Sequence, residues 1–69
     1  MRVVLNNPFV QDLMLKRGWE EQDLANKIGV SKVQVYRVIR GQRFPGNEFI
    51  AGVVKTFPDA EFNQLFKVV

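Results

Sequence analysis

The chain has 69 residues, carries a net charge of +3, and contains neither cysteine nor histidine. This length provides for one domain, near the lower limit at which a single hydrophobic core is stable without disulfides or metals. Without Cys and His, the usual metal ligands and the commonest general bases are missing. We therefore expect no metal site, no cofactor and no enzymatic activity.

Charge is distributed unevenly along the chain. No acidic residue lies between Asp23 and Glu48, whereas that window holds five basic residues: Lys27, Lys32, Arg37, Arg40 and Arg43. The chain thus has a basic middle, which is more informative than the small net charge. No apolar run approaches the roughly 20 residues that span a bilayer, and the N-terminus lacks a signal peptide's apolar core, so we expect a cytoplasmic protein.

The chain begins with an apolar stretch, RVVL, that could form a short strand. Asn7 as the N-cap and Pro8 at the first helical position predict a helix over Pro8–Arg17, which Gly18 ends. Its apolar residues recur at helical spacing and are Phe9, Val10, Leu13 and Met14. Trp19 follows this helix, and we expect it to be a packing anchor.

Two further helices follow with only three residues between them. Acidic residues in the first turn predict a helix over Glu20–Ile28, and Gly29 ends it with a positive φ. Ser31 is a good N-cap for the next helix, Lys32–Arg40, which Gly41 closes. The small Ala25 lies where the two helices must cross closely. Two helices joined by a short turn containing Gly form a helix-turn-helix unit, here about residues 20–40.

The C-terminal part predicts two more helices. Asn47 can cap the first of them, which Pro58 stops and whose inner face carries Phe49 or Ile50, Val53, Val54 and Phe57. Asp59 can cap a short fifth helix over AEFNQLF. The apolar ends RVVL and FKVV could pair as a small two-stranded ribbon. We therefore predict one domain over residues 1–69, an all-α compact bundle of about five short helices with or without that ribbon.

The middle of the chain resembles the Cro/C1-type, or XRE-type, helix-turn-helix regulators of phages and bacteria. The matching residues are RGW at 17–19 and LANKIGVSKVQVYRVIRGQRFP at 24–45, and the likeness extends from the first predicted helix into the fourth. The resemblance is a specific signal because the two patterns LA…IGVS and V…I.G.R.P occur together at the right spacing. The resemblance implies a lambda-repressor-like domain that binds an operator in double-stranded DNA as a transcriptional regulator, most simply a repressor.

The predicted helix 32–40 has two chemically different faces. Val35 and Val38 are three residues apart and point to the core. The opposite face carries Lys32, Val33, Gln34, Tyr36, Arg37 and Arg40, which suit the base edges of a major groove better than a core. By resemblance, the base-contacting residues are Lys32, Val33, Gln34, Tyr36 and Arg37, and the phosphate-contacting residues are Ser31, Arg40, Gln42 and Arg43. Arg37 is the first candidate for a bidentate guanine contact, worth roughly 1–3 kcal/mol.

The chain departs from the family pattern in two places. Glu20 and Glu21 stand where the family often has Ser or Thr followed by Gln, and a carboxylate repels phosphate. Either Glu21 pairs with a basic residue such as Lys32 or Arg37, or it excludes some DNA registers by repulsion. Many family members also pair an Arg of the first helix with a Glu of the recognition helix. The matching positions here are Met14 and Ile39, which we expect to touch and to be largely buried.

Several alternatives remain open from the sequence. Tyr36 either contacts DNA or lies over the neighbouring helix, and exposed Lys or Arg side chains are often merely solvated. Phe62, Phe66 and Val68 either form a homodimer surface or close the core of the monomer. No small-molecule effector site is evident. A different class of function is a protein-interaction or antitoxin-like module on the same fold, with weak or lost DNA binding, for which Glu20 and Glu21 are the best evidence.

Overall fold

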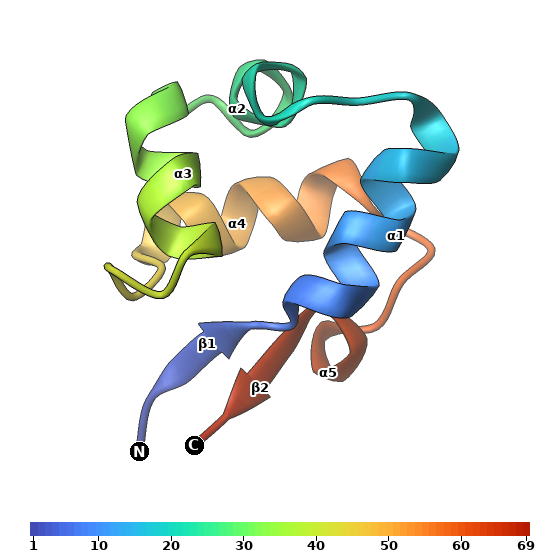
Figure 1. Cartoon of the computed structure of the whole chain (residues 1–69). Helices are drawn as coiled ribbons and strands as arrows, with labels where there is room; N and C mark the ends of the chain where they lie inside the picture. The colour runs from blue at the N-terminus through green and yellow to red at the C-terminus, as the bar shows by residue number, and fades with distance from the viewer.

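The computed structural model covers all 69 residues and contains five helices and two short strands (Figure 1). In chain order these are β1 (Val3–Leu5), α1 (Asn7–Arg17), α2 (Glu21–Ile28), α3 (Lys32–Ile39), α4 (Asn47–Thr56), α5 (Phe62–Leu65) and β2 (Phe66–Val68). Helix α2 contacts both α3 and α4, and α5 contacts α1 and α4. The prediction of a compact, mostly helical domain with a ribbon from the chain ends is confirmed.

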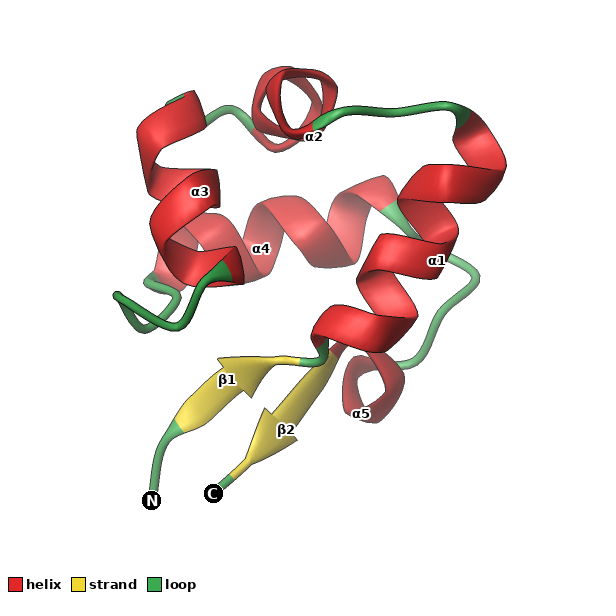
Figure 2. Cartoon of the chain, in the orientation of Figure 1, coloured by secondary structure: helices red, strands yellow, loops and turns green.

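The two strands form an antiparallel ribbon at one end of the bundle, where both termini also lie (Figure 2). Val3 pairs with Val68, Val4 with Lys67 and Leu5 with Phe66. Leu5 and Phe66 are buried members of the main core. An isolated two-stranded ribbon is marginal in water, so this anchoring against the helices explains why so short a ribbon forms.

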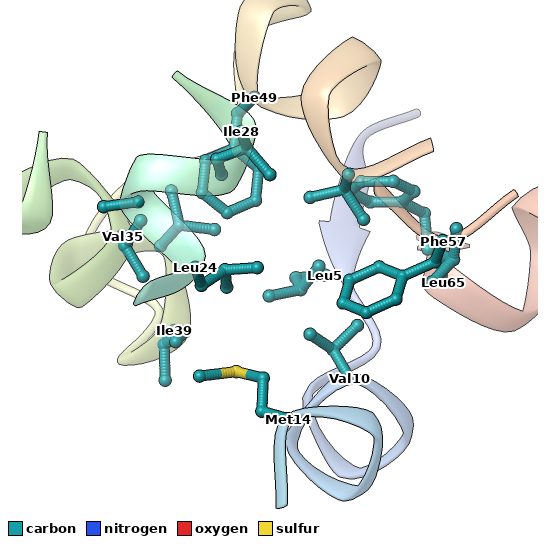
Figure 3. Packing of buried hydrophobic residues seen from close by; sticks show 14 residues of the cluster. Leu5, Val10, Met14, Leu24, Ile28, Val35, Ile39, Phe49, Phe57 and Leu65 are labelled. Carbon is teal, nitrogen blue, oxygen red and sulfur yellow. The ribbon is translucent and has the colours of Figure 1, made fainter. Parts of the chain in front are cut away.

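The core is entirely apolar and draws on every helix and both strands. Its members are Leu5, Val10, Met14, Leu24, Ala25, Ile28, Val35, Val38, Ile39, Phe49, Val53, Phe57, Leu65 and Phe66 (Figure 3). On α4 the buried stripe is Phe49 and Val53, and it continues at the same four-residue spacing to Phe57, which follows the helix; Ile50 is partly buried beside it. The prediction that Val54 faces inward is wrong. Val54 is 39% exposed because it lies beyond the edge of that stripe.

Two helix starts differ from the prediction by one residue. Asn7 and Asn47 are the first helical residues rather than caps, and the N-cap residues are Asn6 and Gly46. The Asn7 side chain makes no cap; its Nδ2 donates to the main-chain oxygen of Ile39, 2.7 Å away. Helix α4 begins one residue after a glycine in extended conformation, which leaves no side-chain cap at that end.

Helices α2 and α5 are both shorter than expected, and a capping residue marks the start of each. Glu20 is the N-cap of α2, and its N–H donates to Asp23 Oδ2 at 2.8 Å, so the helix begins at Glu21. The fifth helix is only one turn long: Asp59 lies outside it, and Glu61 precedes it with its N–H donating to Gln64 Oε1 at 2.8 Å. The expected longer helix over AEFNQLF is therefore wrong in length; of its apolar residues, Leu65 and Phe66 are buried and Phe62 is 45% exposed.

Helices α2 and α4 approach each other closely at Gly52. A Cβ atom built on Gly52 would lie 2.6 Å from both the Cβ and the main-chain oxygen of Ile28. Ala25, the small residue expected where α2 and α3 cross, is fully buried; where α2 meets α4, it is Gly52 that lets the two backbones approach. None of the helices has both the length and the apolar character that crossing a membrane would require.

Candidate nucleic-acid interface

The α2–turn–α3 unit is built by short-range interactions that the sequence encodes. Gly29 has a φ of 79° and donates its N–H to the oxygen of Ala25 at 2.9 Å, which ends α2 and turns the chain. Ser31 caps α3 by accepting the N–H of Gln34 on its Oγ at 3.1 Å. The predictions of a positive φ at Gly29 and of a cap at Ser31 are confirmed. The turn therefore fixes the direction in which α3 leaves α2.

Helix α3 is packed on one side and open on the other. Val35, Val38 and Ile39 are buried and fasten the helix to the core. The opposite side exposes Lys32, Val33, Tyr36 and Arg37. These four side chains and Gln42 line one open hollow of about 420 Å³ that no acidic residue borders. The hollow combines cationic donors, an amide, a phenol and an apolar side chain, which together match the acceptors, donors and methyl groups of base edges.

A second hollow of about 330 Å³ lies on the other side of Tyr36. Its lining is Glu20, Glu21, Gln22, Lys32, Tyr36 and Arg40. Tyr36 and Lys32 border both hollows, so Tyr36 stands between a basic surface and a surface of mixed charge. We call these the basic hollow and the mixed hollow.

Glu21 and Arg40 form an ion pair across the helix-turn-helix unit. Arg40 Nη1 lies 3.0 Å from Glu21 Oε2, and Arg40 Cζ lies over the Tyr36 ring, 3.7 Å from its centroid. Of the two alternatives for Glu21, the structure shows the pairing with a basic residue, and the partner is Arg40 rather than Lys32 or Arg37. An ion pair this open to solvent contributes about 0.2–1 kcal/mol, so its main effect is on the orientation of the side chains.

The structure separates the remaining site candidates. Gln34 is half-buried at the flank of α3 and does not line the basic hollow, unlike the other four base-contacting candidates. Gln42, expected at a phosphate, lines that hollow instead. Arg43 is exposed in the loop after α3, and the exposed Ser31 has its Oγ occupied by the cap.

Trp19 is partly buried against the core, as expected for a packing residue. The centroid of its ring lies 5.8 Å from the centroid of the Phe57 ring.

Comparison with known proteins provides no match: no family model, no curated protein and no solved structure aligns with this chain. The interpretation of this surface accordingly rests on its own residues and geometry.

Asn7 is a supporting residue that sequence reasoning missed. Its bond to Ile39 joins the start of α1 to the end of α3, and its Oδ1 is buried without a hydrogen-bond partner. Pairing a carbonyl of the last α3 turn in this way satisfies a group that the helix itself leaves free. The sequence shows two adjacent asparagines before Pro8, which signals a helix start but not a contact 32 residues away.

Replacing Asn7 by aspartate should destabilise the protein by about 1–3 kcal/mol. The change removes the donor to Ile39 and places a carboxylate oxygen near a carbonyl oxygen in a partly buried site. Asn6→Asp is the matched control, because Asn6 Nδ2 makes a similar bond to the oxygen of Gln64, 2.8 Å away, but on an exposed surface. Urea unfolding of the two variants would measure the difference. Equal losses would show that the Asn7 contact does not hold α3.

Proposed function

We propose that this protein is a sequence-specific double-stranded DNA-binding regulator of the Cro/C1 type, which inserts α3 into the major groove. The observation that carries the proposal is the basic hollow on the free side of a helix whose other side is fixed in the core. A major groove about 12 Å wide admits one such helix. The protein acts by occupying an operator and blocking polymerase access, a repressor without chemistry of its own.

The proposed roles follow from the position of each side chain. Arg37 donates two bonds to guanine O6 and N7, Lys32 donates to a base acceptor, and Val33 contacts a thymine methyl group. Tyr36 and Gln42 extend this contact along the same hollow. Gln34 at the flank, Ser31 and Arg43 are proposed to reach sugar and phosphate, which fixes the register without reading sequence.

We further propose that two copies bind two half-sites about one helical turn apart, because one small module makes few base contacts. Of the three residues considered for a dimer surface, Phe66 is buried and closes the core of the monomer. Phe62 and Val68 are 45% and 57% exposed, and the Phe62 ring stacks on Phe66 with centroids 5.2 Å apart. The proposed dimer surface is therefore reduced to Phe62 and Val68.

A second candidate function is a protein-interaction or antitoxin-like module. The mixed hollow favours it, because Glu20 and Glu21 place two carboxylates beside the same helix, and Glu20, which has no ion-pair partner, would repel phosphates. Such a module would bind its partner through surfaces that do not depend on Arg37.

The deciding experiment is selection of random-sequence duplexes by the purified protein at two salt concentrations. The regulator should enrich a short motif, often as two inverted half-sites. Arg37→Ala should lower affinity for the enriched duplex by about 5- to 150-fold, the equivalent of losing one bidentate base contact.

The matched control is Lys55→Ala, which removes one positive charge from α4 rather than α3. It should enrich the same motif as the wild type with nearly the same affinity. Absence of any enriched motif, or equal effects of the two variants, would contradict the regulator and leave the interaction module.

A further inference from the structure

We infer that Glu21 is a positioning residue of this surface: it withdraws Arg40 from phosphate contact and holds it against Tyr36, which fixes the Tyr36 ring as a ridge between the two hollows. The inference rests on the proposed function and deepens it. It replaces the expected phosphate contact of Arg40 with a role in specificity.

The geometry begins with the position of the two charges. Glu21 is the first residue of α2 and Arg40 follows the last residue of α3, so their 3.0 Å contact spans the whole helix-turn-helix unit. Within the pair, the Glu21 side chain is 24% exposed and that of Arg40 is 42% exposed. Glu21 is therefore the more buried partner, and the Arg40 side chain reaches back to it across the unit.

Arg40 in turn covers one face of the Tyr36 ring. A guanidinium 3.7 Å from the ring centroid is well within the range of cation–π attraction. Tyr36 lies one helical turn before Arg40 on the same face of α3, so the contact needs no distortion of the helix. With Arg40 held by Glu21, the Tyr36 side chain has fewer rotamers open to it than an exposed tyrosine normally has. The ring is therefore held in one position relative to a base pair.

Charge pairing gives this arrangement a measurable signature. The salt dependence of DNA binding counts the phosphates that the protein neutralises, with a slope of about −0.9 per contact in a plot of log K against log salt. A guanidinium already paired with a carboxylate neutralises no phosphate. In the wild type, Lys32, Arg37 or Arg43 should therefore contribute to the salt dependence wherever they reach a phosphate. Arg40 should make no contribution.

Four variants separate this role from a general effect of charge. Glu21→Gln frees Arg40, and should steepen the slope by about one and raise affinity for random duplexes about five- to ten-fold at 0.1 M salt. Its preference for the enriched motif over random duplexes should fall at the same time. Arg40→Ala alone should leave the slope unchanged, and the double variant should return the slope of Glu21→Gln to that of the wild type.

The matched control is Glu20→Gln, which removes the same charge from the same hollow but has no bond to Arg40. Its slope should equal that of the wild type. A second readout needs no DNA: the side-chain protons of Arg40 should show the upfield nuclear magnetic resonance shift of groups lying over an aromatic ring. That shift should be lost in Glu21→Gln and kept in Glu20→Gln.

The outcomes distinguish this inference from the proposed function. If Arg40→Ala flattens the wild-type slope by about one, Arg40 contacts phosphate and the inference fails while the regulator stands. Normal chemical shifts for Arg40 in the wild type would also overturn it. If the wild type enriches no duplex motif at all, the proposed function fails and this inference fails with it.

Discussion

Replacing Gly52 by alanine should destabilise the protein by about 2 kcal/mol, although alanine is the better helix former by about 1 kcal/mol. The new methyl group would lie 2.6 Å from two atoms of Ile28 and 3.0 Å from its Cα. Two of these three atoms belong to the backbone of α2, so no side-chain rotation relieves the contact. Helix α2 must shift away from α4, and it carries the turn and α3 with it.

Thermal and urea unfolding would measure this loss, which corresponds to a decrease of about 10 °C in Tm for a domain of this size. Gly46→Ala is the control, because Gly46 has no atom within 4 Å of its built Cβ. That change should alter stability by less than about 1 kcal/mol. A Gly52→Ala variant as stable as the wild type would show that α2 and α4 are not in backbone contact.

The helix-turn-helix unit could be predicted from the sequence because its signals are local. Gly29 supplies a positive φ, Ser31 supplies a cap, and each acts within three or four residues of its own position. The alternation of buried and exposed residues on α3 is equally local, since Val35 and Val38 define the packed face by helical spacing alone.

Features that depend on how helices cross could not be predicted in this way. The sequence suggested Lys32 or Arg37 as partners of Glu21, and only the relative position of α2 and α3 selects Arg40, the residue after α3, instead. The role of Asn7 is hidden for the same reason, because its partner Ile39 becomes a neighbour only after α1 and α3 pack. A pattern of residue types along one helix contains no information about such contacts.

Introducing a charge at Ile39 should give the largest loss of stability. Ile39 and Met14 are both buried, as predicted, and the end of the Met14 side chain points toward Ile39 (Figure 3). Ile39→Glu places an unpaired carboxylate in an apolar site, and Met14→Arg does the same with a cation. Each single change should destabilise the protein by about 3–5 kcal/mol, a large part of the stability of so small a domain.

The double variant Met14→Arg, Ile39→Glu should recover part of that loss, with a coupling energy of about 1–3 kcal/mol between the two positions. Circular dichroism during urea unfolding would give all four stabilities of the cycle. Leu15→Arg combined with Ile39→Glu is the control, because Leu15 is the next residue of α1 but is 79% exposed and points away from the core. Rescue by Arg at 14 and not at 15 would place the two helices in the register that the proposed Cro/C1-type family stabilises with an Arg–Glu pair. Absence of rescue would remove that support, because the two side chains would then not face each other.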